Sequence, residues 1–176
     1  MANVNITGLP VEVSPDGTGW IPVQVVGETA KRITENQLGD LAFRRLFPAA
    51  MNFLIDGGGG NINAQTWGYL TVPFNATVSG ARLFGNASGT ITVDIWKCTY
   101  AQFDAGSTHP VSGDSICGGF PPTITASTKS STTVTEFQSW STQLLQDDIL
   151  GFNVPSTSAG ISRVTLALDL TRNSAT

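Results

Sequence analysis

From residue 65 onward apolar and polar residues alternate in short runs, which is the pattern of β-strands with one buried face. In the clearest run, 163–170, every second residue is Val or Leu, and the run 90–97 places Ile91, Val93 and Ile95 on one face. Strands are expected at 67–72, 76–84, 90–97, 123–125, 132–135, 149–154 and 161–170. No helical pattern separates them, so the prediction is an all-β fold, an antiparallel, jelly-roll-like β-sandwich.

The first part of the chain has a different pattern. Short apolar stretches within 1–33 are broken by Pro and Gly turn signals, which predicts a small module of two or three short strands. Thr34 and Gln37 have the spacing of a capping box, and four apolar residues then recur at helical spacing. One short helix is therefore expected over about 34–47, ending before Pro48. Residues 49–55 are apolar, but their pattern assigns them to no element.

Four consecutive glycines at 57–60 mark the strongest break in the sequence. Such a tract has no preferred backbone path, and no Gly-Lys-Ser/Thr follows it, as a phosphate-binding loop would require. The tract is therefore interpreted as a hinge. The expected organisation is an N-terminal anchoring module at 1–56, a Gly-rich hinge at 57–61 and a β-sandwich domain at 62–176.

Composition narrows the possible partners. Only 12% of the residues are charged, the formal net charge is −4, and the nine Lys and Arg residues are spread along the whole chain. Phosphate neutralisation needs clustered cations, so neither a nucleic-acid partner nor an electrostatic membrane anchor is expected. The sequence has neither the long apolar run of a membrane-spanning helix nor the start of a signal peptide, which predicts a protein made in the cytosol.

The residues that usually carry chemistry are few and scattered. His109 is the sole histidine and is expected to be a solvated loop residue. Cys98 and Cys117 fit no metal motif and are expected to be free thiols. The adjacent acids Asp147 and Asp148 are interpreted as a polar turn before a strand rather than an acid/base pair. The expectation is a protein with no catalytic residues, no metal site and no cofactor, hence not an enzyme.

Two features leave alternatives open. The section 105–131 is rich in Gly, Ser, Thr and Pro, and such a long loop either makes contacts or is a tolerated surface excursion. The second feature is a set of four tryptophans, which would stack against sugars if exposed but more often anchor a core or an interface. They are Trp20, Trp67, Trp96 and Trp140.

Three motifs follow one another near the N-terminus: Ile-Thr-Gly-Leu-Pro at 6–10, Thr-Gly-Trp-Ile-Pro-Val at 18–23, and Val-Val-Gly-Glu-Thr-Ala-Lys-Arg-Ile-Thr at 25–34, with Leu38 beyond them. This series resembles the N-terminal segment found on many bacteriophage virion proteins. In that segment a strand, a Leu-Pro turn, a second strand, a Gly-containing hairpin and a Thr-initiated short helix occur in this order. The resemblance covers residues 1–40.

Later segments have a likeness of their own. They resemble a β-sandwich module that recurs in phage capsid and tail proteins, and they lie at 89–97, 114–116, 122–124 with Ser127, 140–142, 148–154 and 170–172. Cys98 stands where that module more often has a polar or charged residue. The loop around His109 and Cys117 is longer than expected for the module.

Together the two resemblances imply a structural role in a phage particle. The leading hypothesis is a capsid decoration or cement protein, expected as a homotrimer, that binds and stabilises the coat shell through its N-terminal module. Its partner would be the major capsid protein or another virion protein, and its location the virion, assembled in the host cytoplasm. The residues expected to contact that partner are Ile6, Leu9, Pro10, Trp20, Ile21, Val23, Val25, Leu38 and Leu41.

Three other functions remain as alternatives. A tail or head fibre or a collar attachment protein is less favoured, because the sequence has no internal repeat from which a shaft is built. A carbohydrate-binding adhesion module would use exposed tryptophans, Trp96 or Trp140, and the loop 105–131. A glycan-cleaving enzyme would have only isolated carboxylates to work with.

Overall fold

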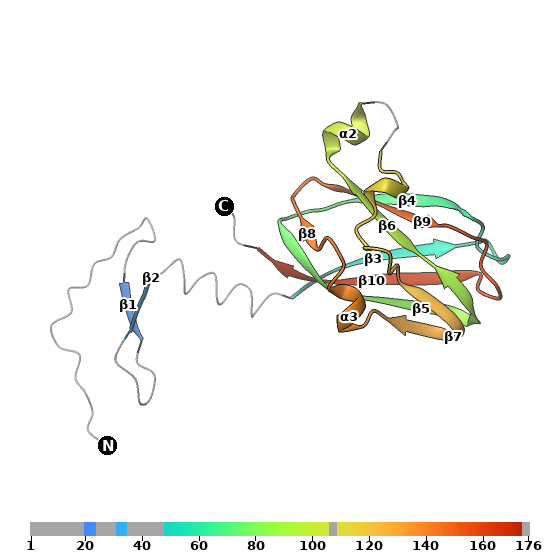
Figure 1. Ribbon diagram of the computed structural model, residues 1–176, viewed down its shortest axis with the longest axis horizontal. Helices are drawn as coiled ribbons and strands as arrows, with labels where there is room; N and C mark the ends of the chain where they lie inside the picture. Colours follow the sequence, from blue (N-terminus) through green and yellow to red (C-terminus); the bar gives the residue numbers. More distant parts are fainter. Residues whose placement is uncertain (1–19, 24–30, 35–47, 106–108, 174–176) are drawn as a thin grey trace, which may run out of the picture. The chain divides into compact units, whose positions relative to one another are not determined.

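The computed structural model describes residues 20–23, 31–34, 48–105 and 109–173, and the chain divides into two units, Met1–Leu46 and Phe47–Thr176 (Figure 1). In the first unit, β1 (Trp20–Val23) pairs antiparallel with β2 (Lys31–Thr34), with Trp20 opposite Thr34. In a two-stranded ribbon each strand is an edge, which explains how Pro22 is accommodated. Apart from Thr34, which ends β2, the helix expected over about 34–47 lies outside the described residues.

The second unit is a sandwich of two antiparallel sheets (Figure 1). The large sheet has the order β3 (Ala49–Asp56), β10 (Arg163–Arg172), β5 (Ala76–Thr92) and β7 (Thr123–Ser131), with the short β8 (Gln143–Leu144) also paired to β5. The small sheet has the order β4 (Gln65–Thr71), β9 (Ile149–Val154) and β6 (Asp94–Cys98). Successive strands mostly alternate between the two sheets, as in a jelly roll. The predicted all-β sandwich is confirmed.

The core follows from the period-2 pattern of the sequence. Val164, Leu166, Leu168 and Leu170 of β10 point inward and are at most 3% exposed. From the small sheet, Phe152 of β9 stacks on a ring of β3, Phe53, with their centroids 4.2 Å apart. Burying one such side chain contributes roughly 1.5–3 kcal/mol. The strongest alternating run of the sequence therefore supplies the centre of the fold.

The domain boundary differs from the expected one. β3 pairs with β10 without interruption, from Ala49 opposite Leu170 to Asp56 opposite Arg163. The unassigned stretch 49–55 is therefore a strand of the sandwich, and the prediction of an anchoring module that reaches residue 56 is wrong. The division lies between Leu46 and Phe47. Without β3, the edge of β10 would be unpaired and the core beside it would be exposed to solvent.

The glycine tract is a turn and not a hinge. The N–H of Gly57 donates to the carbonyl of Ser162 (2.7 Å), and the N–H of Gly58 donates to Oδ1 of Asp56 (3.0 Å). Gly58 and Gly59 have φ angles of 66° and 93°, a region that side chains disfavour, so glycine is required there. The tract leads out of β3 within one domain, which corrects the assignment of 57–61.

The run expected as one strand over 90–97 is two strands in different sheets. β5 ends at Thr92 and β6 begins at Asp94. Between them the N–H of Val93 donates to the carbonyl of Pro122 (3.0 Å), and Oδ1 of Asp94 accepts from the N–H of Ile95 (2.9 Å). At these residues the chain leaves the large sheet and enters the small one, although side chains continue to alternate between the two faces through the crossing.

The strand expected at 132–135 is wrong for a local reason. Thr133 caps a short helix, α3 (Val134–Phe137), and its hydroxyl accepts from the N–H of Glu136 while the Glu136 carboxylate accepts from the N–H of Thr133. A second capping box, Thr99 with Gln102, begins α2 (Tyr100–Asp104). Each reciprocal pair satisfies two amides that a strand would have used in a ladder.

Candidate interaction sites

The expected partner-contact residues are described only in part. Trp20, Ile21 and Val23 lie in β1, where Ile21 stands opposite Ile33 of β2. The others lie outside the described residues: Ile6, Leu9, Pro10, Val25, Leu38 and Leu41. A two-stranded ribbon is at best marginally stable in water by itself, so this pair of strands is suited to gaining order from a partner.

The section 105–131 is shorter as a loop than expected, because β7 continues from Thr123 to Ser131. It follows directly after α2, which ends at Asp104, and its described residues include the 3₁₀ turn η1 (Ser112–Asp114). Beyond η1, Ser115 forms a bridge to Trp96, and the N–H of Ile116 donates to the carbonyl of Ile95 (2.9 Å). Ile116 is 2% exposed. This part of the loop therefore extends the small sheet beside β6 and fills the core, and is no surface excursion.

The carboxylate of Asp94 holds that segment in place. Its Oδ1 accepts from the hydroxyl of Ser115 (2.7 Å), and its Oδ2 accepts from the indole N–H of Trp96 (2.7 Å). The Ser115 hydroxyl oxygen in turn accepts from the N–H of Cys117 (3.2 Å). Hydrogen bonds to an ionised group are among the stronger ones in proteins. Asp94 is therefore a fastening group between β6 and the loop.

The tryptophans give little support to sugar stacking. Trp140 is 6% exposed, and its indole N–H donates to the carbonyl of Phe120 (3.2 Å). Trp96 is half-buried with its N–H bound to Asp94, and the N–H of Trp67, also half-buried, donates to the carbonyl of Asn63 (3.1 Å). A sugar platform requires an open ring face. Trp140 has none, so this observation counts against the adhesion hypothesis at that residue.

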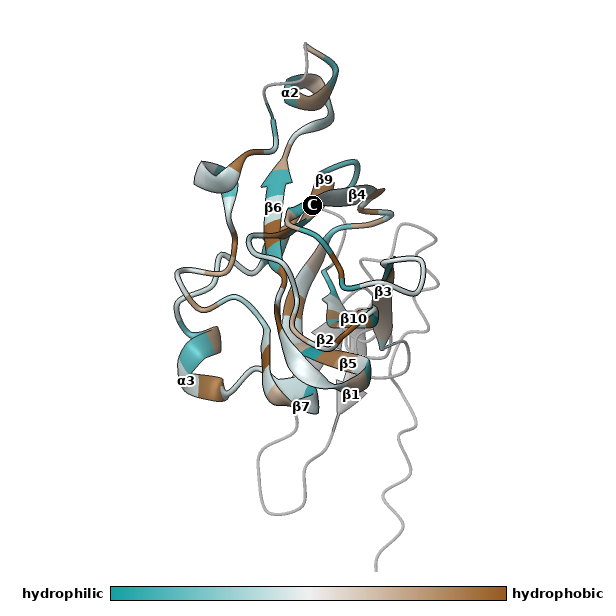
Figure 2. Cartoon of the chain, turned by 90° about the vertical axis from the view of Figure 1, so that its right-hand side faces the viewer, coloured by the Kyte–Doolittle hydropathy of each residue, from teal (hydrophilic) through white to brown (hydrophobic). Residues whose placement is uncertain are grey.

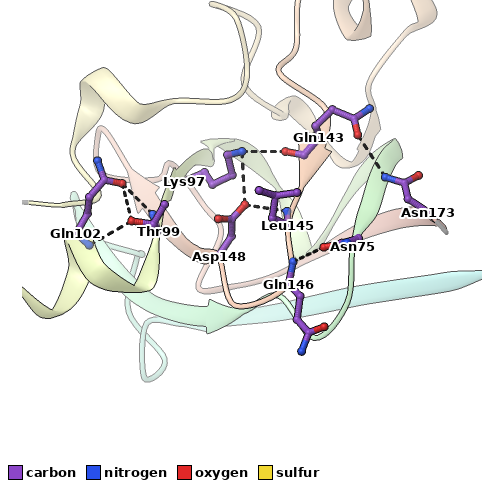
Figure 3. Close-up of polar contacts among 9 residues, drawn as sticks. All are labelled: Asn75, Lys97, Thr99, Gln102, Gln143, Leu145, Gln146, Asp148 and Asn173. Carbon is purple, nitrogen blue, oxygen red and sulfur yellow. Dashed lines mark hydrogen bonds and ion pairs between the residues drawn. The ribbon is translucent and has the colours of Figure 1, made fainter. Parts of the chain in front are cut away.

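The adjacent acids form a polar turn, as the sequence predicts. Asp147 has a φ angle of 68°, and Asp148 is 5% exposed. Oδ2 of Asp148 accepts from the N–H of Leu145 (2.9 Å) and lies 3.5 Å from Nζ of Lys97, which also donates to the carbonyl of Gln143 (2.9 Å) (Figure 3). Figure 3 shows that further amide contacts continue this network to Asn75 and Asn173. The network ties the turn before β9 to β6 and β8.

His109 is not a solvated loop residue. Its Nδ1 lies 2.7 Å from Oδ2 of Asp114, which also accepts from the N–H of Val111 (2.8 Å). The hydrogen bond from His109, followed by the bond from the backbone of Val111, holds the pKa of Asp114 below its usual range. The neighbouring Pro110 lies so close to Gly151 of β9 that a Cβ there would be 2.8 Å from the proline ring. This segment therefore packs on the small sheet.

Both cysteines are free and buried, as expected for thiols without a partner. Cys117 is fully buried, and desolvation raises its pKa to about 12. A thiol reacts as the thiolate, so Cys117 is chemically inert in the folded protein. In the described ranges, no three His, Cys, Asp or Glu side chains lie close enough to hold a metal ion. The helices described there are too short to span a membrane.

A cavity of about 320 Å³ lies between β7 and α3. Its one carboxylate belongs to Glu136, whose Oε2 accepts from the N–H and from the hydroxyl of Thr133, both at 2.8 Å. These bonds lower the pKa of Glu136, so the group is an ionised helix cap. The rest of the lining consists of glycine, hydroxyl residues, two prolines and one aromatic ring: Gly119, Phe120, Pro121, Pro122, Thr123, Ser130, Ser131, Thr132 and Thr133. The carboxylate therefore has no acid/base partner in this lining.

No protein-family model matches the sequence, and no curated protein matches it. Among solved structures, the chain is similar to one described as "Capsid of Ralstonia phage GP4". The two chains share 16% sequence identity with a TM-score of 0.45, and the alignment covers 73% of this chain and 86% of the other.

Proposed function

We propose that this chain is a structural protein of a bacteriophage particle that decorates the coat shell and acts without catalysis. In this proposal the N-terminal unit attaches to the major capsid protein or another virion protein. The sandwich is the part that the particle displays. Copies act together as a trimer, and the protein resides in the virion.

One observation carries the proposal. The segment that resembles the N-terminal segment of phage virion proteins covers about the first 40 residues, and the structure divides six residues further on, between Leu46 and Phe47. The sequence motif therefore lies entirely within the first structural unit. This supports a separate attachment unit followed by an independent domain.

The polar groups of the sandwich support a structural role. Asp94, Asp114, Glu136 and Asp148 each accept a hydrogen bond from a backbone amide nearby, and each also contacts a polar or charged side chain. A general acid or base needs a proton-transfer partner and room for substrate. Groups occupied in this way stabilise the fold, which is what an architectural domain requires.

Truncation at the observed boundary tests the attachment role. Full-length protein and a variant comprising residues 47–176 are mixed with particles of the encoding phage from which the protein has been stripped, and bound protein is measured after sedimentation. We expect the full-length protein to bind and the 47–176 variant to remain in solution with an unchanged thermal unfolding transition. Equal binding by the folded 47–176 variant would contradict the assignment of the anchor.

Copy number separates decoration from the fibre or collar alternative. A decoration protein covers the shell, so its copies per particle should be comparable to those of the coat protein. Quantified staining of purified particles on a denaturing gel measures this ratio directly. A handful of copies per particle would exclude decoration and favour attachment at the tail or collar.

A further inference from the structure

The sheets of the sandwich end in four main edge strands, and three of them are protected against pairing with another chain. β6 is covered by the bridge between Trp96 and Ser115. The pairing of β7 with β5 shifts register twice, and β7 carries Lys129. β4 has an irregular register between Thr66 and Gly68. Bulges, lysines and covering segments are the devices by which natural sheets avoid edge-to-edge association.

β3 has none of these devices. It runs for eight residues in continuous register with β10, contains no proline or lysine, and pairs with no second strand among the described residues. Its outward residues Ala50, Asn52 and Leu54 are exposed. A long, regular edge whose one charge, Asp56, lies at its end is the kind that accepts a further strand.

The core is also incomplete on this side, which we name the β3/β4 side; both strands lie on the same side of the sandwich in Figure 2. A Cβ on Gly68 of β4 would lie 3.0 Å from the ring of Phe53 of β3, so the two strands face each other. Seven partly buried apolar residues pack against the core of the described chain, and six come from β3, from β4 or from the turn after β4. These six are Ala49, Met51, Phe53, Trp67, Leu70 and Phe74.

The β3/β4 side carries few charges, one of them the guanidinium of Arg172, which lies 3.9 Å from the centroid of the Phe74 ring. Between Arg45 and Arg82 the sequence has a single charged residue, Asp56. Its carboxylate is already paired within the chain, with Oδ2 2.8 Å from Nε and 2.7 Å from Nη2 of Arg163. Depletion of charge, together with exposed aromatic and aliphatic side chains, distinguishes the centre of a protein interface from the remaining surface.

From these observations we propose that the β3/β4 side is the interface between copies of this chain, with β3 as its central element. A two-fold interface between identical copies must be complementary to itself, and an antiparallel strand pair satisfies this by its symmetry. Pairing about Asn52 sets Met51 opposite Phe53 of the other copy and Ala50 opposite Leu54, so inner-face residues meet inner-face residues. No like charges meet in this arrangement.

A second copy also suits the attachment role. Only Phe47 and Pro48 separate the N-terminal unit from β3, so association through β3 brings several anchors together. Linked anchors bind with an affinity well above that of a single one. The interface itself does not depend on that role, because it is argued from the sandwich alone.

The test measures the mass of the full-length protein by light scattering during size-exclusion chromatography. We expect twice 18.5 kDa for the wild type and a single copy for Asn52→Lys, which sets a charge at the centre of the exposed edge. The matched control is Thr128→Lys, an equally exposed position on the protected edge β7, which should keep the wild-type mass. Two copies would support the interface, because antiparallel pairing about Asn52 is two-fold and closes with one partner, whereas three copies would contradict this pairing and favour the proposed trimer instead.

Several outcomes would overturn the inference: a wild-type protein of 18.5 kDa at the highest concentration that stays in solution, an Asn52→Lys variant that keeps the wild-type mass, or a control that dissociates equally. Hydrogen exchange of the wild type provides a second test, which does not depend on a variant that could lose its association simply by unfolding. In the wild type the outward amides of β3 should exchange more slowly at high than at low protein concentration. Exchange that is independent of concentration would also contradict the interface.

Discussion

The two lateral sides of the sandwich are closed by different means. On the side of β6 and β7, which we name the β6/β7 side, the chain itself completes the core with buried Ile116, Cys117 and Trp140. The carboxylates of Asp94 and Glu136 fasten the covering segments there. On the β3/β4 side six apolar residues that pack against the core are only partly buried. The chain itself covers the core on the β6/β7 side, whereas the β3/β4 side has the composition of a contact surface.

This difference explains why the small number of charges does not weaken the fold. Buried polar groups stabilise a structure only when they are paired, and the carboxylates of Asp94 and Glu136 on the β6/β7 side are, although the buried hydroxyl of Thr132 there has no hydrogen-bond partner. A surface meant for apolar contact gains nothing from charges, since each would have to be desolvated on association. Because the paired polar groups and the apolar contact residues lie on opposite sides, one small domain can be stable by itself and still present an apolar face.

The largest effect should come from removing β3. A variant comprising residues 62–176 loses Met51, Phe53 and Ile55, and such side chains contribute roughly 1.5–3 kcal/mol each when fully buried. That loss is comparable to the whole stability of a typical domain, about 5–15 kcal/mol. We expect the 62–176 variant to be unfolded or aggregated by circular dichroism, whereas the 47–176 variant unfolds cooperatively. A soluble, cooperatively folded 62–176 protein would restore the boundary at the glycine tract.

The next effect contrasts the two sides through their tryptophans. Trp140→Ala empties a buried site on the β6/β7 side and should lower the free energy of unfolding by about 3–5 kcal/mol. Trp67→Ala, at a half-buried site on the β3/β4 side, should cost clearly less when measured in the Asn52→Lys background. Chemical denaturation of both variants provides the comparison. Equal losses would mean that the two sides are equally complete without a partner.

The strands were predictable where apolar and polar residues alternate strongly and where turn residues mark both ends. The strand expected at 149–154 agrees with the structure, and the one expected at 161–170 is shifted by two residues, to Arg163–Arg172. Alternation continues through Val93, so the crossing between sheets was not predictable from period alone. At the crossing the backbone N–H of Val93 donates to the carbonyl of Pro122, and the side chain of Asp94 accepts from the N–H of Ile95, and neither bond is signalled by the strand pattern.

The two capping boxes and the glycine turn were also signalled in the sequence, but the composition around them suggested other structures. Thr99 with Gln102 and Thr133 with Glu136 have the same capping-box spacing that predicted a helix at Thr34, but they lie in segments rich in β-formers. The glycine tract suggested flexibility, whereas Asp56 and Ser162 hold it in a turn. The β3/β4 side was not foreseeable as a surface, because the residues that form it share a side only once β3 has paired with β10.

Asp94 tests how firmly the β6/β7 side is fastened. Asp94→Ala leaves the indole N–H of Trp96 and the hydroxyl of Ser115 without their acceptor and should cost about 1–3 kcal/mol. Asp94→Asn keeps one carboxamide oxygen as an acceptor and should cost less. Thermal unfolding gives both values, and hydrogen exchange at Ile116 should rise in the order wild type, Asn, Ala. A smaller loss for Ala than for Asn would refute the fastening role.

A smaller, pH-dependent effect should come from the segment that packs on the small sheet. The pKa of Asp114 is lowered in the folded state, chiefly by the hydrogen bond from His109. Its stabilisation is therefore fully present above the ordinary pKa of an aspartic acid, about 3.9, and is lost as the pH falls through the lower value of the folded protein. Thermal unfolding from neutral to acidic pH should show a steeper loss for the wild type than for Asp114→Asn. Asp56 and Glu136 shift in the same direction, so only the difference between the two proteins is diagnostic.

The smallest effect should come from the outer face of the large sheet, which belongs to neither lateral side. There Nη2 of Arg82 lies 2.5 Å from Oδ1 of Asp169, and the two side chains are 47% and 41% exposed. Solvent screens so exposed a pair, and its coupling should be no more than about 1 kcal/mol. A double-mutant cycle with Arg82→Ala and Asp169→Ala, measured by chemical denaturation, isolates that coupling and should show it weaken further in high salt. If the cycle instead gave a coupling as large as the loss in Asp94→Ala, surface ion pairs and not the closure of the β6/β7 side would govern the stability of the sandwich.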